Sequence, residues 1–427
     1  MANQFNREEI ILFEQVLLQF DTDNTISKQA ARFTQPGTEM QRTGDRIWRP
    51  SPQIATTVDG LDITGKLGSI TQMSVPADLT TIANVPWQLD AKEMRDPLYR
   101  DRKAKAASQA LSARINRQMA FKIRDEGSLT VPVSSALSGY DDISLADALM
   151  MENDIVGQKT MVLNPRDYNL MGGNLAQGVN GSRTLMPRSD AALSTTFIGE
   201  IANFTTHKTA FGPTLVAAAG SGYTIDGANQ RFVPASTFTS MGATENQDNR
   251  FMNLVVDAGA GIIKAGDKFT IVGVDALSHI NKESTGQLKT FTVVENITGG
   301  AGPGAITLKI APPIIVGDKT SDAEDDYANV DSVPADGVAI NFQNTQTVQT
   351  NPFFINDSIE VFGGRLAFDE DMAGVAVMRQ STDTGIEIIF AKQGNVITGK
   401  STYRLTIFFG VTNLNPEMNG ILIGGQT

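Results

Sequence analysis

The spacing of apolar residues predicts a short amphipathic helix at residues 7–20. The residues on its apolar side are Ile10, Phe13, Leu17 and Phe20. Glu14 projects from the same side, between Ile10 and Leu18, where a carboxylate needs a cation or water. Because so short a helix is marginal on its own, we expect this segment to be an arm that packs against another surface.

Residues 97–126 carry the clearest helix pattern. Asp96 can serve as the N-cap and Pro97 as the first helical residue, while Gly127 can end the helix. Its apolar stripe comprises Ala104, Ala107, Leu111, Ile115, Met119 and Ile123. An adjacent basic stripe comprises Lys103, Arg114, Arg117 and Arg124. The basic stripe is either a solvated helix face or a surface turned toward a polyanion or an acidic neighbour.

Short runs of alternating apolar and polar residues predict strands elsewhere. Within residues 223–344 such runs occur at 269–271, 291–293 and 306–310, and turn signals rich in glycine lie between them. This spacing is typical of a small antiparallel barrel or sandwich. Residues 50–86 combine β-prone pieces with prolines and glycines, which predicts a long two-stranded excursion.

The segments on either side of the predicted barrel mix helix and strand. We expect a helix over residues 145–155 and strands over 160–163 and 404–411, whereas the Gly- and Asn-rich residues 171–183 are typical of a loop. The β-rich region is therefore interpreted as an insertion into a host domain that resumes after it.

The composition limits the chemistry. The 427 residues exceed the ~250–300 that one hydrophobic core usually supports, so more than one packed unit is expected. The chain has no cysteine, which excludes disulfides, thiolate metal sites and cysteine nucleophiles. It has only two histidines, His207 and His279, which excludes a histidine metal cage. Its formal net charge of −12 disfavours a protein whose main task is to bind phosphates.

Targeting features are weak. Glu8 and Glu9 directly follow Arg7, and polar residues interrupt the apolar stretch 10–20, unlike a secretory signal peptide. No apolar run approaches the ~18–20 residues that span a bilayer. We therefore expect a protein that is made in the cytoplasm and has no membrane partner.

Nucleotide and metal motifs are incomplete. Gly259-Ala260-Gly261 is followed by Lys264, where the dinucleotide fingerprint needs a third glycine. The acidic cluster at 318–326 misses the spacing of a calcium loop, and both histidines are assigned surface or packing roles. No catalytic residue, metal ligand or cofactor is expected, so the motifs favour a protein that is not an enzyme.

Stretches along the whole chain resemble one family. They are Phe33-Thr34-Gln35-Pro36, Met40-Gln41-Arg42, Ile47-Trp48-Arg49-Pro50, Leu163-Asn164-Pro165-Arg166-Asp167-Tyr168, Gly266-Asp267-Lys268, Tyr327-Ala328-Asn329-Val330, Gln393-Gly394-Asn395, Phe409-Gly410-Val411 and the ending Gly425-Gln426-Thr427. In this order they resemble the major coat protein of short-tailed Salmonella-type bacteriophages and their relatives. The resemblance implies an α+β fold of the Hong Kong 97 capsid type, with an N-terminal arm, an extended loop, a spine helix, an axial domain and an inserted antiparallel β-barrel.

The resemblance and the segment pattern together divide the chain into seven parts. These are the N-terminal arm (1–36), a connector (37–49), the extended loop (50–86), the peripheral domain with the spine helix (87–129), the first part of the axial and peripheral core (130–222), the inserted β-barrel domain (223–344) and the second part of the core (345–427).

The resemblance also implies a function and partners. The family builds icosahedral shells from hexamers and pentamers of the coat protein, uses a separate scaffolding protein and a portal ring, expands the shell and encloses double-stranded DNA. A major capsid protein of the virion is therefore expected, assembled in the cytoplasm of the bacterial host. Contact with the packaged DNA is expected to be weak and non-specific. We expect the scaffold not to be fused to the chain, because the sequence begins directly with the arm and shows no long coiled-coil prefix.

Three contact regions follow from the resemblance. The candidates in the extended loop, facing a neighbouring subunit, are Asp59, Asp62 and Lys66. The candidates in a loop of the insertion at 236–250, reaching the next capsomer, are Glu245, Asp248 and Arg250. The candidates for docking of the scaffolding protein on the arm are Glu14, Ile10 and Leu17. Alternatively, Glu14 pairs with Arg7 or Lys28 of its own arm. The insertion is also expected to brace the axial domain of its own subunit.

Two other classes of protein compete with a shell protein. A β-rich tail or adhesin component is disfavoured by the long basic helix and by the lack of fibre repeats. A carboxylate-dependent hydrolase would need two paired acids, and no spacing in the sequence pairs them.

Overall fold

The structure is a computed structural model, and it falls into two compact units that are described one at a time. The residues that it describes are 5, 7–24, 26–33, 46–51, 61, 64, 71–90, 92–93, 95–137, 139–177, 199–209, 212–257, 259–297, 305–317, 322–366, 375–395 and 397–426. Unit 1 comprises Met1–Ile47, Pro76–Met119 and Ile359–Thr412, and unit 2 comprises Trp48–Val75, Ala120–Ser358 and Asn413–Thr427.

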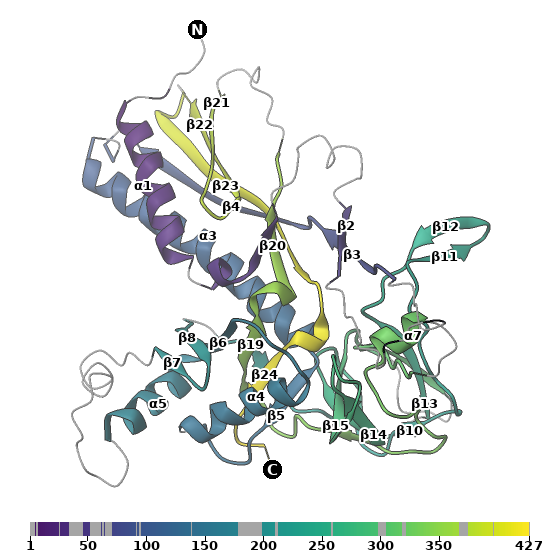
Figure 1. Ribbon diagram of the computed structural model, residues 1–427. Helices are drawn as coiled ribbons and strands as arrows, with labels where there is room; N and C mark the ends of the chain where they lie inside the picture. Colours follow the sequence, from purple (N-terminus) through teal and green to yellow (C-terminus); the bar gives the residue numbers. More distant parts are fainter. Residues whose placement is uncertain are drawn as a thin grey trace. The chain divides into compact units, whose positions relative to one another are not determined.

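Unit 1 combines helices with a six-stranded sheet (Figure 1). Its helical segments are α1 (Arg7–Asp23), the short η1 (Ser27–Gln29) and most of α3 (Pro97–Glu126), whose last residues belong to unit 2. The neighbours in its sheet are, in order, β1 (Ala31–Phe33), β20 (Ile359–Gly363), β23 (Lys400–Asn413), β22 (Glu387–Asn395) and β21 (Val375–Ser381). The sixth strand, β4 (Thr81–Asp90), pairs with β23 in antiparallel fashion.

Helix α3 confirms the predicted long helix and its start. The Oδ1 atom of Asp96 accepts a hydrogen bond of 3.0 Å from the backbone N–H of Leu98, as an N-cap residue does. The six residues predicted for the apolar stripe are all buried. The helix ends at Glu126, before Gly127, as the sequence indicates.

Strand β4 crosses a boundary that the sequence places at residue 86. It pairs with β23 from Thr81↔Phe409 to Asp90↔Lys400, so residues 81–86 belong to the sheet of unit 1. The two-stranded sheet that precedes it pairs β2 (Arg46–Pro50) with β3 (Ser74–Asp78).

The host part of unit 2 is a second six-stranded sheet with helices. Its strand order is β5 (Leu129–Pro132), β24 (Asn419–Ile423), β19 (Asn351–Ile355), β6 (Lys159–Leu163), β8 (Phe204–Lys208) and β7 (Glu200–Ile201). The remaining elements of the host part are α4 (Tyr140–Glu152), α5 (Pro165–Gln177), η3 (Asn356–Ser358), η4 (Pro416–Met418), and the paired β9 (Thr214–Leu215) and β18 (Val348–Gln349). Helix α5 runs to Gln177, so the loop expected from residue 171 onward is wrong for residues 171–177.

The inserted part of unit 2 is a closed β-barrel. Its strand order is β10 (Thr224–Ile225), β13 (Met252–Asp257), β16 (Ile306–Ala311), β15 (Ser284–Val293), β14 (Lys268–Leu277) and β17 (Ile340–Phe342). The two outer strands meet, because Ile225 N–H donates to Val338 O at 2.9 Å and Ile340 N–H donates to Tyr223 O at 3.0 Å. A hairpin of β11 (Thr237–Ser240) and β12 (Ala243–Asn246) and the short helix α7 (Asp322–Tyr327) also lie in this part.

The barrel and the host sheet have separate hydrophobic cores. The barrel core is built on rings and branched side chains that alternate along its strands, such as Phe269, Phe291 and Leu308. The core of the host sheet centres on residues such as Met161, Phe204 and Phe353. The barrel therefore has a hydrophobic core of its own.

Candidate functional site at the seam of the inserted barrel

A buried lysine of the barrel caps the C-terminal end of the spine helix α3. Lys268, the first residue of β14, is 0% exposed. Its Nζ donates to Arg124 O at 2.7 Å, to Gly127 O at 2.6 Å and to Thr292 Oγ1 at 2.8 Å. The three donors of an ammonium group are thus matched by three oxygens. A cation at this end of a helix also faces the negative end of the helix dipole.

The electrostatic cost of this cap is high. Burial lowers the pKa of Lys268 to about 7, although the nearby carboxylates of Asp125 and Asp267 work in the opposite direction. Asp267 is held beside it, because its Oδ1 accepts from Asn344 Nδ2 at 3.0 Å and its Oδ2 accepts from Lys264 N–H at 2.8 Å. The Gly266-Asp267-Lys268 motif therefore builds the joint between barrel and helix.

Strand β15 binds the same end of the helix. The hydroxyl of Thr292 donates to Gly127 O at 2.7 Å, and the hydroxyl of Thr290 donates to Ser128 O at 2.7 Å. Two adjacent barrel strands therefore bind Arg124 O, one of the carbonyls that a helix leaves unpaired at its C-terminus, and the carbonyls of the two residues that follow the helix.

A buried carboxylate forms a second joint. Glu417 of η4 lies 2.7 Å from Lys289 Nζ and 3.2 Å from His279 Nε2, and its Oε1 accepts from Asn329 Nδ2 at 2.8 Å. Burial alone would raise the pKa of Glu417, but the Lys289 ammonium and the His279 ring outweigh it and hold this pKa well below its usual range. His279 also bonds through Nδ1 to Asn153 O at 2.8 Å, so the barrel reaches two elements of the host.

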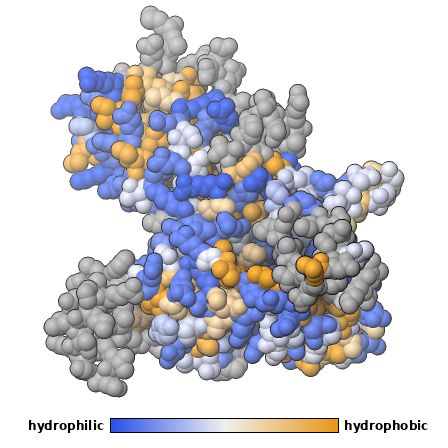
Figure 2. Space-filling model, in the orientation of Figure 1, coloured by the Kyte–Doolittle hydropathy of each residue, from blue (hydrophilic) through white to orange (hydrophobic). Residues whose placement is uncertain are grey.

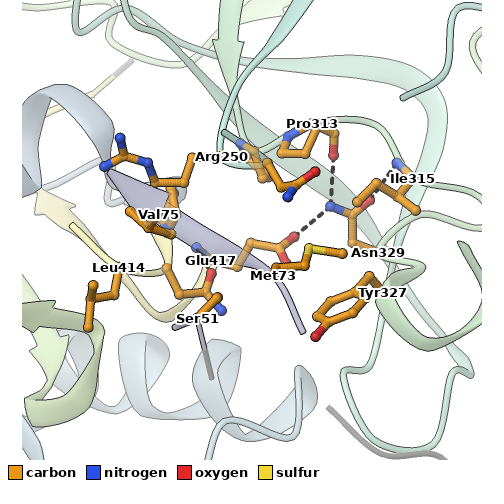
Figure 3. A pocket seen from close by; sticks show the side chains of 14 residues that line it. Ser51, Met73, Val75, Arg250, Pro313, Ile315, Tyr327, Asn329, Leu414 and Glu417 are labelled. Carbon is orange, nitrogen blue, oxygen red and sulfur yellow. Dashed lines mark hydrogen bonds between the residues drawn. The ribbon is translucent and has the colours of Figure 1, made fainter. Parts of the chain in front are cut away.

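The second joint borders a small cavity of about 50 Å³ (Figure 3). Glu417 and Asn329, which are joined by a hydrogen bond, line it together with Met73, Tyr327 and Ser51. Ligand pockets usually measure ~300–1,000 Å³, whereas a water needs only ~10–15 Å³ of such volume. This cavity is thus suited to a few waters that complete a polar joint and is too small for a substrate.

The seam confirms that the insertion braces its own subunit, and it changes the role of Arg250. This residue is buried, pairs with Asp248 at 2.8 Å and donates from Nη1 to Asn413 O at 3.0 Å. Two of the three predicted loop residues, Asp248 and Arg250, are therefore engaged within the chain, close to the end of the β11–β12 hairpin. Glu245 lies on β12 in the exposed hairpin, opposite Phe238.

The structure separates the three residues predicted for the arm surface. Glu14 and Ile10 are exposed, whereas Leu17 is 7% exposed and packs inside unit 1. The buried face of α1 consists of Glu9, Leu12, Phe13, Val16, Leu17 and Phe20. The assignment of Ile10 and Glu14 to the apolar side is therefore wrong, and the carboxylate on that side is Glu9. The signal was its position three and four residues before Leu12 and Phe13.

The remaining predicted residues fall into two groups. Asp59, Asp62 and Lys66 lie outside the described residues. In the basic stripe Lys103, Arg114 and Arg117 are exposed, whereas Arg124 is half-buried, pairs with Asp125 at 2.7 Å and donates to Thr214 O at 2.8 Å. Arg124 thus takes part in the end of the helix and does not extend the exposed stripe.

A comparison with models of known families matches residues 1–425 to the P22 coat protein, gene protein 5. The chain belongs to this family. As a member of this family, the chain is a major capsid protein that forms an icosahedral shell. Its role is structural. The expected α+β fold of the Hong Kong 97 type with an inserted barrel is confirmed, and so is the resemblance on which it rested.

Solved structures of phage proteins are similar to this member of the P22 coat protein family. A structure from Mycobacterium phage Che8 has 9% sequence identity with this chain and a TM-score of 0.42. The match covers 93% of this chain and 90% of that chain. The capsid structure of the Cyanophage P-SCSP1u has 9% sequence identity with this chain and a TM-score of 0.45. The match covers 93% of this chain and 87% of that chain. The CUS-3 coat protein I-domain is 32% identical, with a TM-score of 0.23 over 29% of this chain and 95% of that chain.

Membership in the P22 coat protein family also fixes where the protein is found. It self-assembles into capsid shells and is located in the capsid of the virion. In the described ranges, no helix has the length and apolarity that crossing a membrane requires.

Proposed function

We propose that copies of this chain form hexamers and pentamers around a separate scaffolding protein, and that the resulting shell later expands. The shell encloses double-stranded DNA, which enters through a portal ring, and assembly takes place in the cytoplasm of the bacterial host. The observation that carries this proposal is the family match over residues 1–425. The braced barrel supports it, because a shell subunit must keep its shape under load from its neighbours.

The β11–β12 hairpin is the proposed contact with a neighbouring capsomer. All eight residues of its two strands are exposed, and a tight turn with positive φ at Met241 and Gly242 joins them. Met241 at this turn is 107% exposed and Phe238 is 42% exposed. Apolar side chains at the tip of a projecting hairpin are costly in a free monomer and are suited to burial against another subunit. Glu245 supplies a charge for the same contact.

The arm is the proposed docking site for the scaffolding protein. Exposed apolar residues accompany Glu14 on α1, namely Ile10, Ile11 and Leu18, and Figure 2 shows hydrophobic surface where α1 and α3 lie. An ion pair between Glu14 and a basic residue of the scaffolding protein would be weak and sensitive to salt, which suits a partner that must leave.

The test is assembly of the purified chain with and without a scaffolding protein of the family. Closed, scaffold-filled shells are expected with the scaffolding protein, and slower or aberrant assembly without it. Glu14→Ala should lower the yield of closed shells, whereas Gln15→Ala, which changes an exposed neighbour, should not. Wild-type yield for Glu14→Ala at every salt concentration would overturn the docking site. Equally good assembly without the scaffolding protein would overturn the need for it.

A further inference from the structure

The arm helix α1 is held on unit 1 by a buried polar contact. Glu9 is 5% exposed. Its Oε1 lies 2.6 Å from Lys392 Nζ and accepts from the hydroxyl of Tyr403 at 3.0 Å. Burial, followed by the charge of Glu9, raises the pKa of the Tyr403 hydroxyl, which therefore stays a hydrogen-bond donor at neutral pH. Among the described residues, a cation and a neutral donor thus bind the carboxylate.

Both partners of Glu9 belong to one row across the sheet of unit 1. Lys392 on β22 pairs with Tyr403 on β23, and Tyr403 pairs with Trp87 on β4. Directly paired residues project from the same face of a sheet, so this row presents its side chains together. The ring of Tyr403 stacks on Trp87 and on Phe390, with centroids 5.7 Å apart in each case.

Most of the other buried side chains of the helix are apolar and repeat along it, with polar contacts from Ser108 and Asn116 of α3. Phe13 stacks on Phe390 at 5.8 Å, and the hydroxyl of Ser108 on α3 donates to Val16 O at 3.2 Å. The buried apolar positions of α1 are Leu12, Phe13, Val16, Leu17 and Phe20. A slip by one helical turn, ~5.4 Å, replaces each of the first three by another apolar residue of the same stripe. The apolar contacts alone therefore distinguish poorly between neighbouring registers.

We propose that Glu9 is a positioning residue that fixes the register of the arm helix on its own subunit. In the native register its charge meets Lys392 and Tyr403. After a slip by one turn, the buried carboxylate would be separated from the half-buried ammonium, and an unpaired buried charge is costly. A single buried polar position sets register in paired helices in the same way, at some cost in stability. Fixed register keeps Ile10, Ile11 and Leu18 in one orientation, whichever partner contacts them.

Exposed acids on the same helix serve as matched controls. Glu8 pairs with Arg100 at 2.6 Å, but its side chain is 71% exposed, so solvent screens the pair. Glu14 is also exposed. Substitution of either one by glutamine removes the same charge from α1 as Glu9→Gln does. Because the chain has no native cysteine, introduced cysteine pairs report on register without background.

The experiment measures docking and register in the full-length chain. Glu9→Gln leaves the half-buried Lys392 without its counter-charge, so the amides of α1 should exchange with solvent at least ~10-fold faster, while Glu14→Gln should leave them unchanged. Glu9→Met combined with Lys392→Met should restore slow exchange. Register is then measured by oxidation of Ser108→Cys paired with Val16→Cys, compared with Ser108→Cys paired with Leu12→Cys or Phe20→Cys.

In the wild-type background the pair at residues 16 and 108 should cross-link at least ~10-fold faster than the pairs displaced by one turn. In the double-methionine background this preference should fall to within about twofold. Unchanged exchange in Glu9→Gln would overturn the proposal. A retained single register in the double-methionine variant would overturn it as well. Rapid exchange in that variant would also overturn it, because the ion pair would then supply docking strength and not register.

Discussion

Replacement of Lys268 by methionine is the sharpest test of the cap on the spine helix. The substitution keeps a long side chain in the core but withdraws the ammonium from Arg124 O, Gly127 O and Thr292 Oγ1. In this variant Gly127 O still accepts a hydrogen bond from the Thr292 hydroxyl at 2.7 Å. The carbonyl of Arg124 is therefore the acceptor most affected by the loss of the ammonium. A buried carbonyl deprived of its donor costs about 1–3 kcal/mol.

The free-energy cost of burying the Lys268 ammonium opposes the benefit of these hydrogen bonds, and this cost depends on pH. Burial lowers the pKa of Lys268 from 10.5 to about 7, which corresponds to about 5 kcal/mol. Between these pH values the unfolded chain holds a proton that the folded chain has released, so stability rises with pH across this window. Below pH 7 both states hold the proton, and the penalty for burying the ammonium is complete. From pH 7 to pH 10 the wild-type chain should gain about 3 kcal/mol from this one group.

The assay is urea unfolding followed by far-ultraviolet circular dichroism at pH 7, 8, 9 and 10. The free energy of unfolding of wild type minus that of Lys268→Met should increase by about 3 kcal/mol across this series, because all other titrating groups cancel in the difference. Lys264→Met, which removes an exposed lysine from the same turn, is the control. A difference that stays constant from pH 7 to pH 10 would contradict this prediction, because the three oxygens would then compensate the buried charge completely.

Three further predictions follow from the packing and the charge. Gly420→Ala would place a Cβ 1.9 Å from Leu129 O and should lower the free energy of unfolding by about 3 kcal/mol, measured by urea unfolding. Gly394→Ala is the control and should be tolerated, because its Cβ would meet only Ser401 Oγ at 4.0 Å. Expressed alone, residues 223–344 should show a β-type circular dichroism spectrum and cooperative melting, because the barrel has its own core; a random-coil spectrum would contradict this. The full chain should bind naked duplex DNA weakly and without sequence preference, because its net charge is −12, and nanomolar affinity at ~0.15 M salt would count against it.

The elements that the sequence predicts well are those with strong local signals. Asp96, Pro97 and Gly127 mark the ends of α3, and alternation marks β14, β15 and β16. Helix α5 (Pro165–Gln177) was not predicted, and its second half was taken for a loop because Gly172, Gly173 and Asn174 have poor helix propensity.

The sites that the sequence misses depend on contacts between distant segments. Lys268 and Thr292 are distant in sequence from Arg124 and Gly127, and Glu9 is distant from Lys392 and Tyr403. Periodicity predicted a carboxylate on the buried side of the arm but chose Glu14, because it took Ile10 for a buried residue. The buried stripe of α1 is rotated toward Leu12 and Val16, away from Ile10 and Glu14. Only the surface against which the helix packs decides which of these two faces is buried.

Electron cryomicroscopy of particles assembled from the purified chain and its scaffolding protein tests the central claim most directly. Closed icosahedral shells of hexamers and pentamers are expected, in which Lys268 of every subunit caps the spine helix of that same subunit. Fibres, unassembled monomers, or shells in which the barrel has separated from the end of the spine helix would contradict it.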